Sequence, residues 1–217
     1  MIDVASARRQ MIEQQVRAWE VLDARVLETM QRVPREDFAP PAYRDLAFAD
    51  LRVPLGHGQS MLPPKLEGRI LQSLEIQPED RVLEVGTGSG FFAACLGALA
   101  RSVRSMDVFP DFIVTARANL ERAGVHNVAV EAMDAMTLSA DGAYDVIALT
   151  GSLPVYDARF ERALAMGGRL FAVVGDGPVM AAQRITRTGA GQWLRESLFE
   201  TSLEPLVHAP RPPRFVF

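Results

Sequence analysis

The sequence predicts an α/β fold in which a mostly parallel, nucleotide-binding sheet follows a helical N-terminal region. The apolar run 81–85 (RVLEV) leads directly into a loop with Gly86, Gly88 and Gly90, and an apolar helix is expected at 91–100. Strand-like and helix-like segments then alternate regularly to about residue 175. Such alternation is typical of βαβ units, in which helices cover a parallel sheet.

Residues 1–76 lack this alternation, and we expect them to form a helical cap and a substrate lip. The cap and the sheet domain of residues 77–217 are expected to form one compact unit. In residues 6–20 the apolar side chains fall on one helical stripe, and a second short helix is expected at 23–31. Residues 54–64 (PLGHGQSMLPP) are polar and glycine-rich, which fits either a lip over a substrate or an ordinary connection.

The remaining elements follow in order along the chain. A helix at 65–74 precedes the central strand, and a helix with Pro110 at its start and Gly124 beyond its end is expected at 111–123. A further helix is expected at 156–165, and Phe215–Phe217 is expected to anchor the proline-rich end. Strands after the central one are predicted at 102–107, 127–132, 144–149 and 169–175, with a final antiparallel hairpin at 182–187 and 193–200.

The glycine loop and two acids predict the kind of ligand. The loop has the form E-x-G-x-G-x-G from Glu84 to Gly90, which departs from the dinucleotide fingerprint and excludes a P-loop. Asp107 ends the next strand, 21 residues after Gly86, where an acid accepts hydrogen bonds from ribose hydroxyls. Asp134 follows the third strand and is placed to face an adenine.

Each acid alone could be a solvated strand end, but together they predict a site for S-adenosyl-L-methionine rather than for a dinucleotide. That ligand needs contacts to its ribose and its adenine, and because it has no diphosphate it needs no diphosphate-binding residues. Its product after methyl transfer is S-adenosyl-L-homocysteine. The predicted donor-binding residues are Glu84, Gly86, Thr87, Gly88, Gly90, Asp107, Val108, Asp134, Ala135 and Thr150.

Composition limits the alternatives. The chain of 217 residues has a formal net charge of −4, which argues against a general nucleic-acid binder. Its single cysteine, Cys95, forms no internal disulfide, and its three histidines are scattered, so no metal site is predicted. No apolar run approaches the ~18 residues of a membrane span. We expect a soluble, cytoplasmic monomer.

Five motifs carry a family resemblance, and they are Val33–Phe38 (VPREDF), Pro54–Ser60 (PLGHGQS), Arg81–Gly90 (RVLEVGTGSG), Tyr144–Pro154 (YDVIALTGSLP) and Met166–Gly175 (MGGRLFAVVG). From about residue 9 to 205 the chain resembles the protein-L-isoaspartate O-methyltransferases, which are protein-repair enzymes. The resemblance implies a seven-stranded, Rossmann-like sheet of the class I methyltransferase type with an N-terminal helical cap. It also implies S-adenosyl-L-methionine as methyl donor and an isoaspartyl carboxylate, in damaged proteins or peptides, as acceptor.

The lip departs from the family pattern G-Q-[ST]-I-S-x-P, whose second hydroxyl residue has the active-site role. Leu62 stands at that position, and its side chain forms no hydrogen bond. Ser60 keeps the first hydroxyl, and Asp107 replaces the more usual Glu. The expected catalytic positions are therefore Ser60 and Leu62, with Leu62 unable to act as the serine does. The lip and its rim are expected to comprise His57, Gln59, Ser60, Met61, Gly151 and Ser152.

Three functions stay open at this point. The first is methyl transfer to isoaspartyl residues. The second keeps the donor and changes the acceptor to another carboxylate or a hydroxyl, on a small molecule or a single partner protein, which the change at Leu62 motivates. The third is a donor-binding or adaptor protein without turnover, against which the complete set of donor residues counts. A carboxylate acceptor has a pKa near ~4 and needs no general base.

Overall fold

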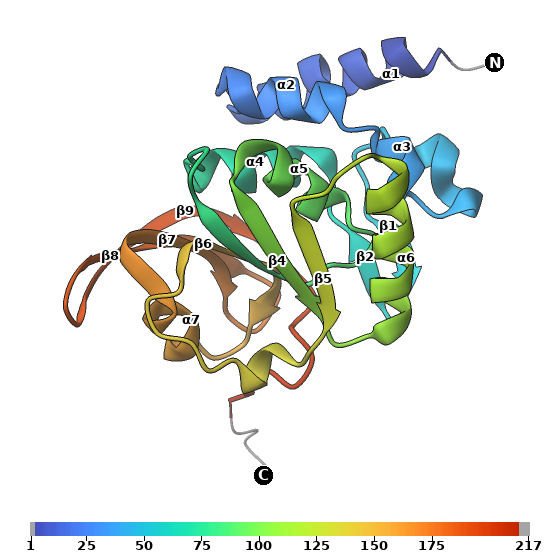
Figure 1. The fold of residues 1–217 in the computed structure, drawn as a ribbon. Coiled ribbons are helices and arrows are strands. Elements are labelled where there is room, and N and C mark those ends of the chain that lie inside the picture. Colours follow the sequence, from blue (N-terminus) through green and yellow to red (C-terminus); the bar gives the residue numbers. More distant parts are fainter. Residues whose placement is uncertain (1–2, 213–217) are drawn as a thin grey trace.

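A computed structural model describes residues 3–212 and places a seven-stranded sheet at the centre of the molecule (Figure 1). The strand order is β5-β4-β3-β6-β7-β8-β9, in which the first five are parallel and β8 is antiparallel to both neighbours. The predicted seven-stranded, mostly parallel sheet is therefore confirmed. The strands are β3 (Arg81–Val85), β4 (Ser102–Asp107), β5 (Val128–Ala132), β6 (Tyr144–Leu153), β7 (Leu164–Val174), β8 (Met180–Gly189) and β9 (Gln192–Thr201).

Alternating side chains of the buried strands feed two hydrophobic clusters, one on each face of the sheet. In β3, Val82 belongs to one cluster and Leu83 to the other, as the two-residue period of a strand requires. The first face carries α4 (Pro64–Ser73), α5 (Phe91–Leu99) and α6 (Pro110–Arg122). The second carries α7 (Ala158–Arg162) and the 3₁₀ turn η4 (Ala135–Thr137).

The N-terminal cap lies over α4 and α5 at the top of Figure 1. The helix expected at 6–20 consists of α1 (Val4–Met11), a π-helical stretch η1 (Ile12–Val16) and a 3₁₀ turn η2 (Arg17–Trp19). Asp23 caps the second helix by accepting a hydrogen bond from the Arg25 N–H at 2.8 Å. Further cap elements are α2 (Ala24–Arg32), α3 (Arg35–Phe38) and η3 (Pro41–Leu46), of which the last two had no clear sequence period.

Three local expectations differ from the structure. The expected lip loop is a β-hairpin, β1 (Val53–Gly56) and β2 (Gln59–Met61), whose tip residue His57 adopts a left-handed φ of 51°. The expected rim loop after residue 149 instead continues β6 to Leu153. The helix expected at 156–165 shortens to α7 because β7 already begins at Leu164. The expected anchor Phe215–Phe217 lies outside the described residues.

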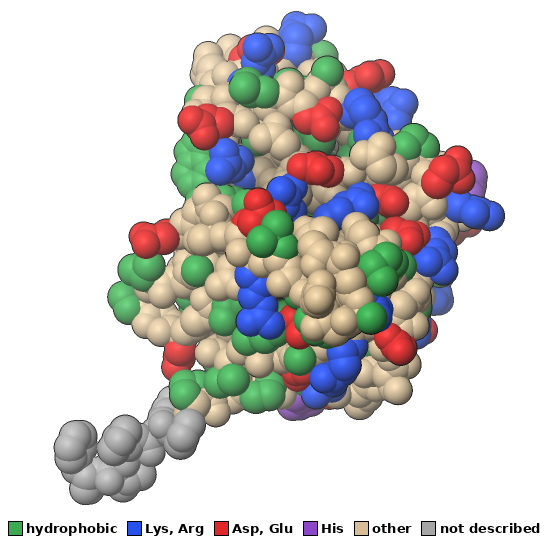
Figure 2. Space-filling view, turned by 90° about the vertical axis from the view of Figure 1, so that its left-hand side faces the viewer, with side chains coloured by type: hydrophobic (Ala, Val, Ile, Leu, Met, Phe, Trp, Pro, Cys, Tyr) green, Lys and Arg blue, Asp and Glu red, His purple; other side chains and the backbone are tan. Residues whose placement is uncertain are grey.

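Charged side chains of both signs are interspersed on the face of the molecule in Figure 2, with no gathering of one sign. Among residues 3–212, no helix is long and apolar enough to cross a membrane. These residues also contain no group of three or more His, Cys, Asp or Glu side chains arranged to hold a metal ion.

The N-terminal helices approach α4 closely at Gly68. A Cβ at this position would lie 2.8 Å from Val16 Cγ1, 3.2 Å from Val21 Cγ2 and 3.3 Å from Met30 Sδ. The absence of a side chain therefore allows the cap helices to pack directly on α4.

Replacing Gly68 by valine should destabilise the protein by forcing the cap away from α4. We expect Gly68→Val to lower the free energy of unfolding by about 1–3 kcal/mol, the range for overpacking a filled core. The matched control is Ala118→Val on the exposed side of α6, expected to change it by less than about 0.5 kcal/mol. Equal denaturation midpoints for the two variants would contradict this packing role.

Candidate donor and acceptor site

One cavity opens at the carboxyl ends of β3, β4 and β6, between the glycine loop and the lip hairpin. This edge of an open α/β sheet is where such folds bind ligands. Most of the residues predicted from the sequence line it, and these are Gln59, Ser60, Met61, Leu62, Gly86, Thr87, Gly88, Asp107, Val108, Asp134, Ala135, Thr150 and Gly151. His57, Glu84, Gly90 and Ser152 lie elsewhere, in places described below.

The glycine loop has a backbone that only glycine adopts without strain. Gly86, Gly88 and Gly90 have φ values of 101°, 50° and 85°. A Cβ on Gly86 would lie 2.2 Å from Thr150 Oγ1, which donates to the carbonyls of Val85 and Gly86, each at 2.9 Å. The loop is thereby held against the end of β6 with its backbone open to the cavity. Gly90 instead packs against Ala116 of α6 at the start of α5.

Asp107 holds this loop from the end of β4. Its Oδ2 accepts the Gly88 N–H at 2.9 Å, and its Oδ1 accepts the Phe109 N–H at 3.1 Å. Burial raises the pKa of this carboxyl above its usual value, and the backbone hydrogen bonds oppose that rise. A carboxylate oxygen accepts more than one hydrogen bond, so both oxygens retain lone pairs toward the cavity. Asp107 can therefore order the loop and, at the same time, accept hydrogen bonds from the hydroxyls of a ligand.

Glu84 lies behind the loop and is absent from the cavity wall. Its side chain is fully buried and its Oε2 accepts a hydrogen bond from Ser105 Oγ at 2.5 Å. Ser105 Oγ in turn lies 2.6 Å from Thr87 Oγ1 of the loop. Burial raises the pKa of Glu84 to about 8. The structure thus places this predicted donor residue beneath the loop, connected to it through Ser105.

The far end of the cavity is bounded by Asp134 and by the chain after β9. Asp134 Oδ1 accepts the Met136 N–H at 2.8 Å, and its Oδ2 lies 2.8 Å from His208 Nδ1. Ser152 is fully buried and donates through Oγ to the Leu203 carbonyl at 3.0 Å, so it secures the C-terminal segment 202–209 instead of lining the rim. Glu204, Leu206 and Val207 from this segment line the cavity.

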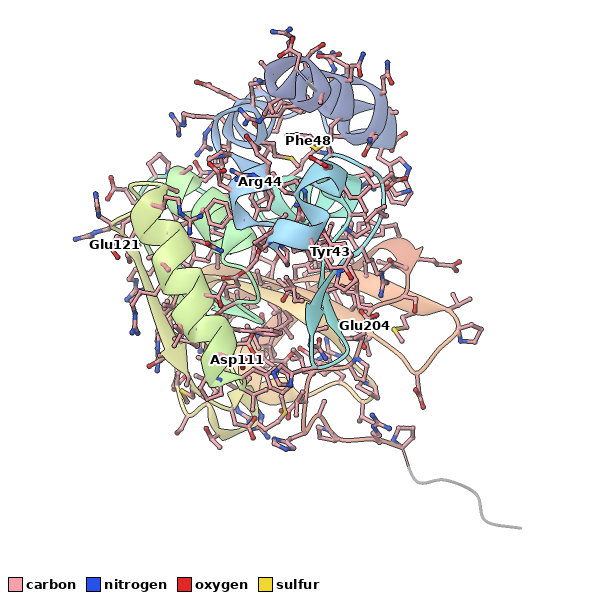
Figure 3. All side chains as sticks on the ribbon, turned by 90° about the vertical axis from the view of Figure 1, so that its right-hand side faces the viewer. Tyr43, Arg44, Phe48, Asp111, Glu121 and Glu204 are labelled. Carbon is pink, nitrogen blue, oxygen red and sulfur yellow. The ribbon has the colours of Figure 1, made fainter. Side chains whose placement is uncertain are left out.

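The lip hairpin is fastened at its tip. Figure 3 shows β1 and β2 between Asp111 at the lower end of α6 and Glu204 of the C-terminal segment. His57 at the tip stacks on Phe109, with ring centroids 4.2 Å apart, and its Nε2 lies 3.0 Å from Asp111 Oδ2. That hydrogen bond lowers the pKa of Asp111. His57 therefore fastens the hairpin tip and does not face the cavity.

The acceptor side of the cavity holds three contrasting side chains. Ser60 Oγ is buried and has no hydrogen-bond partner among the described residues. Leu62 is only 6% exposed and presents an apolar wall. Glu67, from the first turn of α4, also lines the cavity, and its Oε2 accepts a hydrogen bond from the buried guanidinium of Arg35.

Sequence reasoning missed Arg35, Glu67 and the C-terminal segment. A sequence signal existed for Glu67, because it is a lone acid beside Leu66 and Ile70 on the apolar side of a predicted helix. Arg35 lies within VPREDF, but nothing in that motif indicates a partner 32 residues away. The C-terminal contacts are likewise long-range.

Comparison with known proteins identifies the family. The family model for protein-L-isoaspartate(D-aspartate) O-methyltransferase matches residues 6–210. A protein-L-isoaspartate O-methyltransferase from Koribacter versatilis is 37% identical over 201 residues, which cover 92% of this chain and 90% of that protein. A second relative, protein-L-isoaspartate O-methyltransferase 2 from Marinobacter nauticus, is 35% identical over 207 residues and 94% of each chain.

Solved structures agree on the fold. A crystal structure from Plasmodium falciparum, assigned as a protein-L-isoaspartate O-methyltransferase and complexed with S-adenosyl-L-homocysteine, superposes with a TM-score of 0.80. It covers 95% of this chain and 99% of that one at 17% identity, so this likeness speaks for the fold alone. The family match confirms the predicted methyltransferase class and its S-adenosyl-L-methionine donor. The chain belongs to the protein-L-isoaspartate(D-aspartate) O-methyltransferase family.

Proposed function

We propose that this protein transfers the methyl group of S-adenosyl-L-methionine to the free carboxylate of isoaspartyl residues in damaged proteins or peptides. The observation that carries the proposal is that one cavity has the glycine loop and Asp107 on one wall and the lip residues 59–62 on the other. A donor on the first wall and a carboxylate under the lip would meet inside it. A monomeric enzyme and a cytoplasmic location belong to the same proposal.

The donor wall suits a nucleoside without phosphates. The loop backbone lines the cavity without side chains at Gly86 and Gly88. Each oxygen of Asp107 accepts one backbone hydrogen bond and can accept another from a ribose hydroxyl. No positive side chain of the described lining residues is available to neutralise a diphosphate. Asp134 and Ala135 would lie beside the adenine.

The acceptor chemistry needs positioning more than proton transfer. S-adenosyl-L-methionine supplies a methyl group activated by its positive sulfur, and displacement in line with the carbon–sulfur bond moves it to the acceptor. The acceptor carboxylate is ionised at neutral pH, so the lip needs to hold one oxygen about 3–3.5 Å from the methyl carbon and to exclude water. Leu55, Met61 and Leu62 supply the apolar part of that enclosure.

Ser60 is the lip hydroxyl available to bind the acceptor. Its Oγ is buried without a partner, and a buried hydroxyl that lacks a hydrogen bond is costly, by about 1–3 kcal/mol. An acceptor carboxylate would remove that cost by accepting a hydrogen bond from the Ser60 hydroxyl. Ser60 therefore holds the acceptor, with no role as a base.

A second candidate acceptor, another carboxylate or a hydroxyl, is favoured by one observation. Leu62 lines the acceptor wall with a side chain that forms no hydrogen bond. Such a wall could contact an apolar group beside the oxygen that is methylated. A small-molecule acceptor would carry a group of this kind.

Labelled methyl transfer to a short isoaspartyl peptide, with the matching aspartyl peptide as control, separates the two candidates. The first predicts selective labelling of the isoaspartyl peptide. The second would be favoured if the parent protein binds the donor without labelling the isoaspartyl peptide while the Leu62→Ser variant labels it. A parent enzyme that is already fully active would remove the basis of the second candidate.

Asp107→Ala should raise the donor's dissociation constant by about 100-fold, because it removes the carboxylate for the ribose and the acceptor of the Gly88 N–H. Calorimetric titration with S-adenosyl-L-homocysteine measures this. Asp141→Ala, whose side chain is 87% exposed, is the control and should bind like the parent. Parent-like binding by Asp107→Ala would show that the ribose assignment is wrong.

Ser60→Ala should raise KM for the isoaspartyl peptide by about tenfold, the effect of losing one hydrogen bond to a charged group. The donor's dissociation constant should stay unchanged, because the donor wall is intact. Steady-state kinetics with Ser60→Thr, which keeps the hydroxyl, provides the control. If both variants matched the parent, Ser60 would have no part in binding the acceptor.

A further inference from the structure

A buried ion pair joins the acceptor wall, through Glu67, to Arg35 behind it, and it has no part in the reaction described so far. Arg35 of α3 and Glu67 of α4 are 0% and 2% exposed. Besides Glu67, the Arg35 guanidinium donates to the Ala47 carbonyl and to the Leu62 carbonyl, each at 2.7 Å. The Glu67 carboxyl and the Leu62 backbone are therefore fixed to one another through a single side chain, and both residues face the cavity.

The surroundings of Glu67 make its charge easy to remove. Burial raises the pKa of this carboxyl to about 7, although the charge and hydrogen bond of Arg35 lower it. The other titratable groups that face it are Glu84 of β3 and Cys95 of α5, and both are themselves fully buried with raised pKa values. Among residues 3–212, Arg35 is the positive charge that opposes the rise in the pKa of Glu67 and of Cys95.

An acceptor carboxylate would bring a further negative charge to this wall. Two carboxylates that share a buried site hold one proton between them rather than both ionising. The acceptor must stay ionised to attack the methyl group, so the proton belongs on Glu67. A neutral carboxyl has one O–H donor, whereas the Leu62 side chain beside it has none.

We propose that Glu67 binds the isoaspartyl acceptor in its protonated form and donates a hydrogen bond to the acceptor carboxylate. This inference rests on the function proposed above. Glu67 takes one proton from solvent as the acceptor enters and returns it when the methyl ester leaves. In between, the oxygen–carbon bond forms and the sulfur–carbon bond breaks, while Glu67 keeps its proton. The acceptor's negative charge is then balanced by Arg35 through Glu67.

The pH dependence of kcat/KM for the isoaspartyl peptide tests this directly. Because the protonated carboxyl is the binding form, kcat/KM at saturating donor should be level below about pH 7 and fall about tenfold per pH unit above it. In Glu67→Gln the amide donates at every pH, so its profile from pH 6 to 9 should be flat within about twofold.

The matched control is Glu161→Gln, another buried glutamate bound to an arginine, at 2.9 Å from Arg195, but on α7 away from the cavity. It should keep the parent's pH profile. Donor binding and the thermal midpoint of each variant show whether it has folded.

A parent kcat/KM that does not fall above pH 7 would overturn the inference, and this result needs no variant. A profile that rises with pH in the parent, with loss of activity in Glu67→Gln, would also overturn it, because Glu67 would then be a base. Methylation of the peptide in either case leaves the proposed function standing. A parent that methylates no isoaspartyl peptide at any pH would end both proposals.

Discussion

The Arg35 guanidinium is the constraint on which the acceptor half of the site depends. It is completely buried and contacts three segments, namely the carbonyls of Ala47 and Leu62 and the carboxyl of Glu67. The guanidinium also lies over the ring of Phe91, with its carbon 4.8 Å from the ring centroid. Phe91 is the first residue of the helix after the glycine loop. Because one buried side chain bonds to all three segments, it fixes the backbone at Ala47, the lip and α4 relative to one another.

The two halves of the cavity are built on different physical principles. Backbone geometry shapes the donor wall, where left-handed glycines leave room and Asp107 orders the loop through N–H groups. Buried polar side chains shape the acceptor wall. There, Ser60 lacks a hydrogen-bond partner among the described residues, and burial and Arg35 shift the pKa of Glu67 in opposite directions, to about 7. A fixed donor wall suits a ligand that is always the same. A wall whose Glu67 carboxylate can be neutralised by a proton suits an acceptor that is itself negatively charged.

The donor wall could be predicted from the sequence because its signals are local. The spacing of Gly86, Gly88 and Asp107 fixes a strand, a turn and the next strand end, and most of the predicted donor residues line the cavity. The lip hairpin escaped prediction because three- and four-residue strands have too few alternations to detect. The Arg35–Glu67 pair and the Ser152–Leu203 contact join residues far apart in the chain, and no local pattern encodes such a pairing.

Proton uptake during acceptor binding is the most direct measure of the charge on this wall. An isoaspartyl peptide would be titrated calorimetrically at pH 8 into the protein with S-adenosyl-L-homocysteine, in two buffers of different ionisation enthalpy. We expect a net uptake of up to one proton per peptide, because a carboxyl with a pKa of about 7 is mostly ionised at pH 8 before binding and protonated after it. Binding with no proton uptake would contradict the assignment of the proton to Glu67.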